Sequence, residues 1–385
     1  MLLITNGHIL TMEGTELKNG CILVKDGKIA EIAETIEAPA GVEIIDAEGR
    51  LVLPGFIDAH SHLGMWEDAI GFEGADGNEM TDPVTPHLRA IDGMNPLDRT
   101  FEEARNGGVT STASGPGSAN VIGGQFAVIK TAGDRIDDMI VMEPAAMKCA
   151  FGENPKRVYN EKGKAPMTRM AIAAEMRQAL YKAFEYMEKL EAAKEDPSKK
   201  PAFDFKMEAL QPVVNREIPL KAHAHRADDI LTAIRIAKEF DLRITLEHCT
   251  EGHLIADHIK AEGLTAVVGP SFGDRSKYEL KNLTFETPGV MSKAGIKVAI
   301  MTDHPVIPLQ HLPMCAALSV KSGMDEMEAL KAITINAAEI MEVEDRLGSL
   351  KVGKDADIVI WNKHPFLMDS EVGTTIIDGK VVYQK

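Results

Sequence analysis

Residues 52–62 carry the two side chains with the clearest capacity for chemistry, His60 and His62. A proline-glycine turn precedes a short apolar run, Phe56–His60, that is typical of a buried strand. Side chains two residues apart lie on one face of a strand, so Asp58, His60 and His62 are expected to point the same way. Two imidazoles at the carboxyl end of a strand supply half of a metal site, although the same spacing also occurs at ordinary polar strand ends.

Further residues of metal-ligand type stand at the ends of later apolar runs. His223 and His225 close one run, His248 closes the next, and Asp303 follows the last. In a barrel of parallel strands the carboxyl ends meet at one mouth, however distant they are in the sequence. Each residue alone fits a chance polar strand end. Together with His60 and its neighbour, they predict one shared metal site.

The middle of the chain must supply the elements that position these side chains. There, short apolar runs alternate with helical stretches. This alternation is typical of repeated β/α units and predicts an α/β protein with a (β/α)8 barrel. The predicted strands are Phe56–His60, Val109–Ala113, Ala127–Lys130, Ala145–Ala150, Leu220–His223, Arg243–His248, Ala266–Gly269 and Val298–Thr302. The predicted helices are Pro96–Asn106, Ala227–Glu239, Glu251–Glu262, Thr287–Ala294 and Met324–Ile340.

Both ends of the chain have a different pattern, with apolar runs separated by Asn-Gly and Asp-Gly pairs that are hairpin signals. Residues 1–53 and 350–385 are each too short for a core of their own, so we expect them to form one small β-sandwich beside a barrel of residues 54–349. Two insertions, at about 64–95 and 153–212, interrupt the barrel pattern. The second contains a long charged helix, which we expect at the surface or at a contact between the subunits of a homo-oligomer.

The composition limits the class of protein. The 385 residues are 44% hydrophobic and have a formal net charge of −17, which suits a large core and argues against nucleic acid or an anionic membrane as partner. Four widely spaced cysteines without a Cys-x-x-Cys pair fit reduced thiols. The N-terminus lacks the pattern of a signal peptide, and no apolar run reaches the roughly 20 residues of a membrane helix. We therefore expect a soluble, cytoplasmic protein with a small-molecule substrate.

The chain resembles the amidohydrolase superfamily of metal-dependent hydrolases, and within it the imidazolonepropionase-related branch. The resemblance covers nearly the whole chain, including its opening strands, and it implies a distorted (β/α)8 TIM-like barrel beside a β-sandwich made from both termini. The motifs that carry it are Pro-Gly-Phe-Ile-Asp-Ala-His-Ser-His at 54–62, Thr-Asp-His-Pro at 302–305 and, after Asn336-Ala337-Ala338, Leu-Gly-Ser-Leu-Lys-Val-Gly-Lys-Asp-Ala-Asp-Ile-Val-Ile-Trp at 347–361.

Carried over residue by residue, the resemblance implies that His60 and His62 bind a first metal ion with Asp303. His223 and His248 would complete that site or hold a second ion. Zinc is the usual metal for such ligands, with iron, manganese and nickel as alternatives. A bound metal lowers the pKa of its water to about 7. Asp303 is then expected to move the proton from water to the leaving group, while the metal or His248 polarises the substrate carbonyl.

Lys148 ends the fourth predicted strand, where some families of the superfamily carry a lysine that is carbamylated by carbon dioxide and bridges two metal ions. A buried lysine beside cations is expected to lose its proton, which carbamylation requires. Alternatively, Lys148 reaches solvent or pairs with Glu143 or Glu153. Glu153 is itself a further candidate ligand. The sequence therefore leaves the number of metal ions open.

Residues around the predicted metal site suggest contacts to a substrate. His225 shares a strand face with His223 and can be a ligand, a substrate contact or a neighbour. Arg226, Arg89 and Arg275 can meet a substrate carboxylate, although lone arginines are usually surface groups. We assign these four residues to substrate binding.

The expected reaction is hydrolysis of a C–N bond in a cyclic or linear amide. A deaminase is an alternative, but deaminases of the superfamily carry His-x-x-Glu on the fifth strand, whereas the place three residues after His223 is Arg226. A dipeptidase fits the form of the site with a carbamylated Lys148. A catalytically inactive scaffold is an alternative of another class, but it is expected to lose ligands that this chain retains.

Overall fold

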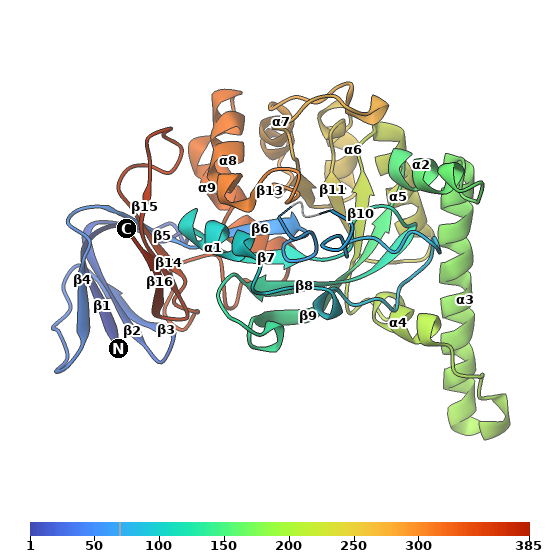
Figure 1. Ribbon diagram of the computed structural model, residues 1–385, viewed down its shortest axis with the longest axis horizontal. Helices are drawn as coiled ribbons and strands as arrows, with labels where there is room; N and C mark the ends of the chain where they lie inside the picture. The colour runs from blue at the N-terminus through green and yellow to red at the C-terminus, as the bar shows by residue number, and fades with distance from the viewer. Residues whose placement is uncertain (69–70) are drawn as a thin grey trace.

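Two eight-stranded sheets organise the computed structural model, which describes residues 1–68 and 71–385. We call them the barrel sheet and the terminal sheet. Figure 1 shows the terminal sheet at one end of the molecule, with both chain termini in it, and the barrel sheet beside it among the helices. The predicted α/β fold class, with a barrel and a separate sheet from both termini, is confirmed.

The barrel sheet runs in the order β13-β12-β11-β10-β9-β8-β7-β6. Each of its strands overlaps one of the predicted strands. Their bounds are β6 (Phe56–Ser61), β7 (Val109–Ser114), β8 (Ile122–Lys130), β9 (Ile140–Ala150), β10 (Leu220–Ala224), β11 (Ile244–His248), β12 (Ala266–Val268) and β13 (Val298–Ile300).

The edge strands β6 and β13 are joined mainly by Asp58, which is fully buried. Its Oδ2 accepts hydrogen bonds from the backbone N–H and the hydroxyl of Thr302, at 2.9 and 2.6 Å, and its Oδ1 accepts one from the N–H of His60 at 3.0 Å. Burial raises the pKa of Asp58 to about 7, although these hydrogen bonds oppose the rise. A backbone hydrogen bond of 2.9 Å from His62 to His304 adds to the contact. The barrel is thereby nearly closed.

β8 departs from the predicted β/α repeat. It pairs antiparallel with both β7 and β9, whereas the other neighbouring pairs in the barrel sheet are parallel. The connections on either side of β8 are short, and only the 3-10 helix η2 (Ile136–Asp138) lies in them. A parallel pair needs a crossover of about a dozen residues or more, so these short connections allow only antiparallel neighbours. The prediction of regular β/α units does not hold for β7–β9.

Each of the predicted helices has a counterpart; α5 (Ala227–Glu239) has the predicted bounds, and the others are shorter. The others are α1 (Arg99–Asn106), α6 (Ala256–Ala261) after η4 (Gly252–Leu254), α7 (Thr287–Lys293), α9 (Glu326–Ala332) and α10 (Ile335–Ile340). The predicted helix Met324–Ile340 is thus divided between α9 and α10. Helix α8 (Leu312–Lys321) and the short η5 (Tyr278–Leu280) and η6 (Leu309–His311) are additional.

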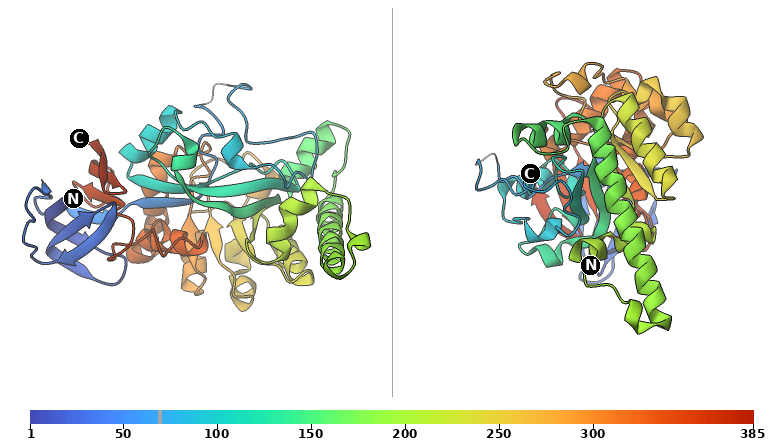
Figure 2. Two further views of the ribbon diagram at one scale, coloured as in Figure 1. Left: turned by 90° about the horizontal axis from the view of Figure 1, so that it is seen from below. Right: turned by 90° about the vertical axis from the view of Figure 1, so that its right-hand side faces the viewer.

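The second insertion forms three helices, α2 (Glu153–Glu161), α3 (Arg169–Glu195) and α4 (Phe205–Val214), with η3 (Pro197–Lys199) between the last two. Figures 1 and 2 show α3 along the end of the barrel that is farthest from the terminal sheet, with its C-terminal end extending beyond the other helices. Among the described residues, no helix combines the length and the apolar character needed to cross a membrane.

The described part of the first insertion, 64–95, is largely irregular. Residues 69–70 lie outside the described residues. The described part contains the 3-10 helix η1 (Ala90–Asp92) and touches β8 through isolated bridges, one of which joins Arg89 to Gln125.

The terminal sheet joins the first and last segments of the chain, because β5 pairs antiparallel with β14. The turns at Asp26–Gly27 and Asp378–Gly379 have positive φ at both residues, between 49° and 77°, as the Asp-Gly hairpin signal predicts. The exact domain bounds remain a prediction. The strands are β1 (Leu2–Leu10), β2 (Glu16–Lys25), β3 (Lys28–Ala33), β4 (Glu43–Asp46), β5 (Leu51–Pro54), β14 (Ile358–Trp361), β15 (Val372–Ile377) and β16 (Lys380–Gln384).

Lys130, the last residue of β8, connects the barrel sheet to the terminal sheet. Its ammonium is buried and lies 2.5 Å from Asp357, 3.1 Å from Asp355 and 3.2 Å from Asp378. Asp355 also pairs with Lys28. Burial alone would raise the pKa of Asp355, but Lys130 and the hydrogen bond from Lys28 hold it at about 2. The Lys-Asp-Ala-Asp part of the C-terminal motif is therefore structural.

Lys130→Met is expected to lower the free energy of unfolding by about 3–5 kcal/mol, because it leaves buried carboxylates without their cation. Lys28→Met is the matched control. It removes an ion pair whose lysine is 48% exposed, and should cost about 1 kcal/mol or less. Urea unfolding of both variants measures the difference, and equal losses would contradict the role of Lys130.

The folded pKa of Asp355 is below its unfolded value of about 3.9, so its stabilisation is present above about pH 4 and is lost as the pH falls towards 2.

Candidate functional site

Two groups of residues with metal-ligand chemistry lie at the mouth of the barrel, where the parallel strands end. Within each group the candidate ligand atoms lie within 4.8 Å of one another. The ring centroids of His60 and His248 are 5.3 Å apart, so the two groups adjoin. The first group is His60, His62 and Asp303, and the second is His223, His225 and His248.

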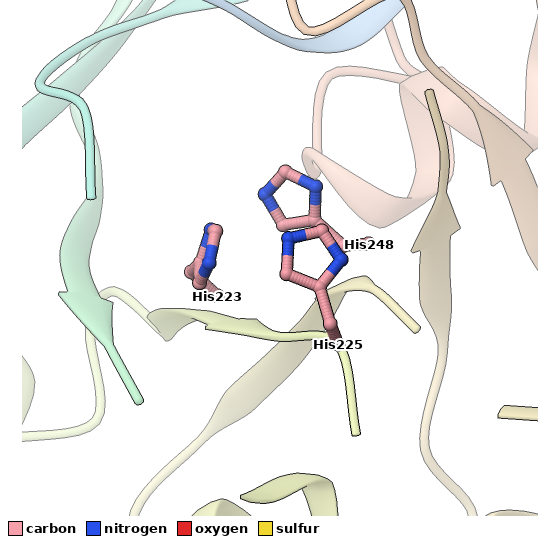
Figure 3. Close-up of side chains that lie close together, drawn as sticks. All are labelled: His223, His225 and His248. Atoms are coloured by element: carbon pink, nitrogen blue, oxygen red, sulfur yellow. The ribbon is translucent and has the colours of Figure 1, made fainter. Parts of the chain in front are cut away.

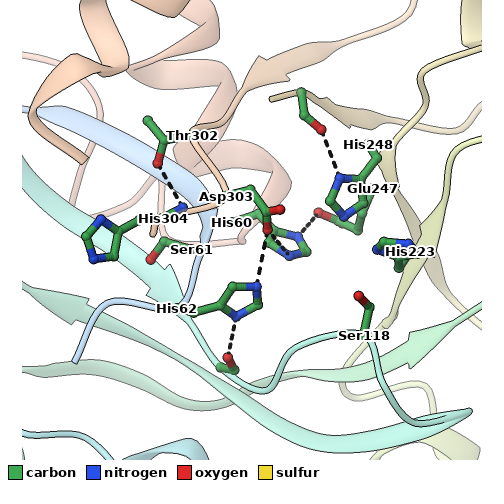
Figure 4. A network of polar contacts seen from close by, with 12 residues as sticks. His60, Ser61, His62, Ser118, His223, Glu247, His248, Thr302, Asp303 and His304 are labelled. Atoms are coloured by element: carbon green, nitrogen blue, oxygen red, sulfur yellow. Dashed lines mark hydrogen bonds and ion pairs between the residues drawn. The ribbon is translucent and has the colours of Figure 1, made fainter. Parts of the chain in front are cut away.

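The first group converges on the carboxylate of Asp303. Its Oδ1 lies 3.2 Å from His62 Nε2 and 3.6 Å from His60 Nε2, and Figure 4 shows both rings beside it. His62 Nδ1 lies 2.7 Å from the carbonyl oxygen of Gly115. A carbonyl only accepts, so Nδ1 carries the proton and Nε2 keeps a lone pair for a metal. Asp303 has φ 54°, a left-handed value that aspartate tolerates better than most residues.

Glu247 contacts the first group and was missed by the sequence analysis. Its Oε2 lies 2.7 Å from His60 Nδ1 and 3.0 Å from the ammonium of Lys221, and its Oε1 accepts a hydrogen bond of 2.6 Å from Thr245. All of these side chains are buried. A carboxylate on Nδ1 fixes the ring and leaves Nε2 for a metal. The available signal was an acid inside a short apolar strand, because glutamate is rarely buried without a partner.

The second group contains nitrogen atoms that lack a partner. His248 Nδ1 lies 2.9 Å from the carbonyl oxygen of Gly269, while its Nε2 is buried and has no hydrogen bond within the described residues. The same holds for His223 Nδ1. His225 Nδ1 lies 2.8 Å from the hydroxyl of Thr250. Figure 3 shows the three rings close together. Buried polar atoms are normally satisfied, and a metal ion would satisfy these.

The charge state of the rings suits metal binding. Burial is the main cause that lowers the pKa of His60, His223 and His248 well below the ordinary value of histidine, and the Lys148 ammonium adds to it. Burial, with Lys277, lowers the pKa of His225 to about 3. These imidazoles are neutral at pH 7, which is the form that binds metal ions.

Lys148, on β9, lies beside the first group. It is fully buried, and its Nζ is 2.9 Å from His60 Nε2. Burial lowers its pKa to about 8, although Asp303 and Glu247 oppose the fall. Within the described residues it forms no ion pair with Glu143 or Glu153, and its ammonium does not reach solvent. Both alternative placements of Lys148 are therefore wrong, and its bridging role stays a prediction.

The three arginines predicted as substrate contacts take different positions. Arg226, next to His225, donates to a neighbouring aspartate at 2.9 and 2.8 Å. Arg89 binds the carboxylate of Glu143, at 2.9 Å, and Arg275 donates to a backbone carbonyl at 2.8 Å. The structure brings Arg226 near the second group. Arg89 and Arg275 form their contacts elsewhere.

The segment before α2 holds this helix beside the second group. The N–H of Phe151 donates to the carbonyl oxygen of His223 at 2.9 Å. Gly152 has φ 88°, and a Cβ there would lie 2.8 Å from Glu279 Oε2. The same oxygen accepts a hydrogen bond of 2.9 Å from the N–H of Glu153, while Glu279 Oε1 lies 3.7 Å from His225 Nε2. Glycine is therefore required at this approach.

Comparison with known proteins gives a consistent result. A model of the amidohydrolase family matches residues 51–382. The crystal structure of an amidohydrolase from Thermotoga maritima MSB8 has a TM-score of 0.97 and 45% identity, with 100% of both chains covered. Imidazolonepropionase from Symbiobacterium thermophilum is 25% identical over 418 residues, covering 94% of this chain and 90% of that protein. Amidohydrolase tasK of Hapsidospora irregularis is 30% identical over 94% of this chain, which spans 39% of the length of that relative.

Proposed function

This chain belongs to the amidohydrolase family, and we propose that it hydrolyses a C–N bond in a cyclic or linear amide of a small molecule at the two adjoining ligand groups. The single observation that carries this proposal is the pair of buried imidazole nitrogens, on His223 and His248, that have no partner among the described residues and belong to the group adjoining that of Asp303. A purely structural cluster would be expected to satisfy these atoms internally.

The site is proposed to hold one or two divalent ions, with zinc as the default for these ligands. His60, His62 and Asp303 would bind one ion. His223 and His248, now joined by His225, would bind the other, with a carbamylated Lys148 between the two. When bound, the ions supply a water of lowered pKa and a Lewis acid for the substrate carbonyl.

The side chains of the protein would perform the proton transfers. Asp303 faces both rings of the first group, so its carboxylate is placed to accept a proton and to return it to the departing nitrogen. Glu247 would keep His60 in the required tautomer. His248 is the second candidate for the proton transfer.

Among related reactions, dipeptide hydrolysis is the second candidate, because the burial of Lys148 against His60 favours the form of the site with a bridging lysine. Deamination has less support. Its glutamate would stand three residues beyond His223, where Arg226 is bound to a neighbouring aspartate.

A homo-oligomeric state and a cytoplasmic location are further proposals. Cys21, Cys149, Cys249 and Cys315 are buried free thiols, which suits a reducing compartment. Light scattering of the purified protein would test the oligomeric state.

We expect the purified protein to hold one to two equivalents of a divalent transition metal at the two ligand groups. Chelation should abolish hydrolysis, and metal added back should restore it, because the histidines are already neutral and arranged. Elemental analysis and a screen of lactams, N-acyl amino acids, dipeptides and aminated heterocycles measure both effects. Apoprotein that takes up no stoichiometric metal would overturn the proposal.

A further inference from the structure

An open pocket of about 490 Å³ lies beside the second ligand group. Lys156 and Arg157 of α2, Arg169 at the start of α3, and Arg226 line it, while Glu153 is the one acidic residue of its lining. The whole chain has a net charge of −17, so this local excess of basic side chains runs against its composition. A concave surface lined by one sign of charge raises the local concentration of ions of the opposite sign.

Two residues of the pocket lining lie next to the second ligand group. Glu153 lies on this lining and, through its N–H, contacts Glu279, whose other carboxylate oxygen is 3.7 Å from His225 Nε2. Arg226 directly follows His225, and its guanidinium lies 5.9 Å from the ring centroid of Tyr278, which also lines the pocket. A substrate that reacts at the ligand groups and extends past His225 towards α2 would meet this pocket.

The basic side chains differ in how far they are already neutralised. Arg169 and Arg226 are each held by an aspartate, at 2.9 and 2.8 Å. The closest approach of Arg157 to a carboxylate is 3.8 Å, to Glu161, with its side chain 55% exposed. Lys156 is exposed and forms no ion pair within residues 1–68 and 71–385. Lys156 and Arg157 are thus the groups that are available to a ligand.

We propose that Lys156 and Arg157, with Arg226 behind them, form an anion subsite, and that the substrate carries a carboxylate on the side of the scissile C–N bond that faces α2. N-acyl amino acids and dipeptides have this arrangement. The inference rests on the proposed function, and it selects acidic linear amides over neutral lactams and aminated heterocycles. An arginine binds a carboxylate through two parallel N–H donors, and a lysine adds a mobile charge.

The test compares two double variants that remove the same charges. Lys156→Met with Arg157→Met empties the subsite. Lys238→Met with Arg216→Met is the matched control, because Lys238 lies in the last turn of α5 and Arg216 precedes β10, at the end of the barrel opposite to its mouth. Both control residues are ion-paired at the surface, at 2.8 and 2.5 Å.

The probes are a panel of N-acetyl amino acids and glycyl dipeptides, each paired with its own C-terminal carboxamide. Calorimetric binding and turnover are measured with the metal-loaded protein. In the wild type at least one carboxylate should bind about tenfold more tightly than its carboxamide, an effect typical of one or two charge-assisted hydrogen bonds. The subsite variant should lose this preference through KM, with kcat nearly unchanged, while the control variant retains it.

The outcomes separate the two proposals. Hydrolysis of the panel without any preference for the carboxylate, or with a preference that survives in the subsite variant, would overturn the anion subsite and leave C–N hydrolysis standing. Preferential binding of the carboxylate that is lost only in the subsite variant, without turnover of any probe, would support the subsite and count against the proposed function.

Discussion

Asp303→Asn is expected to lower kcat by about 10²–10⁴-fold while bound metal is retained, because the loss of a general base typically has this effect. The substitution keeps the size of the side chain and one oxygen that can face His60 and His62. The backbone should not move, since Asn tolerates the left-handed φ of 54° at this position as well as Asp does. The change therefore isolates proton transfer from folding and from most of the metal binding.

The experiment measures turnover and metal content of the same preparation, with the substrate identified by the screen. Asp274→Asn is the control, because Asp274 lies exposed on the loop between β12 and η5, within the same region of the barrel mouth. A variant with normal metal content and turnover close to that of the wild type would show that another residue moves the proton. His248 would then be the next to test.

The parts of the site that the sequence predicts are those set by local patterns. His60 and His62 stand two residues apart at a strand end, and Asp303 follows an equally clear strand, so alternation and barrel geometry together predict their convergence. His225 was placed among the substrate contacts, although its spacing from His223 already allowed a ligand. The structure groups it with His223 and His248.

The parts that the sequence does not predict depend on partners that are distant in the chain. Glu247 binds His60 across 187 residues, and nothing local marks it as the partner of that ring. Arg89 binds Glu143 across 54 residues, so its pairing is equally invisible in the sequence. In both cases the fold brings the two groups together, and a pattern of spacing carries no information about such a contact.

The fold shows the same division. The hairpin turns at Asp26–Gly27 and Asp378–Gly379 follow from the preference of these residues for positive φ. The antiparallel direction of β8 was predictable from the short connections on either side of it. The sequence analysis assumed regular β/α repeats and therefore did not use the length of these connections. Helix α4 contains Pro212, which weakens the helical pattern in the sequence, and it is kept by packing of Leu210 and Val213 in the core.

Lys148→Met is expected to reduce bound metal from two equivalents to one and to lower turnover by about 10²-fold or more. Loss of a group that only supports a metal ligand already lowers activity by up to about this factor, and loss of a bridging ligand should lower it at least as much. Methionine keeps an unbranched apolar stem in the buried position, so packing on β9 should be conserved. What is lost is the nitrogen atom beside His60 that a carbamate requires. That carbamate forms when the neutral amine makes a bond to the carbon of carbon dioxide and releases one proton.

Lys221→Met is the matched control, since Lys221 lies opposite Lys148 in the register of β9 and β10, is equally buried and contacts Glu247. A general effect of removing a buried cation would appear in both variants, whereas a bridging role predicts that only Lys148→Met loses an ion.

Carbon dioxide should also affect metal uptake by the wild type. Apoprotein reconstituted in buffer free of carbon dioxide should take up the second ion slowly, and bicarbonate should accelerate it, because burial lowers the pKa of Lys148 to about 8 and leaves part of the amine neutral near that pH. An experimental structure with a single ion and an unmodified ammonium at Lys148 would establish a mononuclear site, in which Asp303 and the histidines act without a bridge.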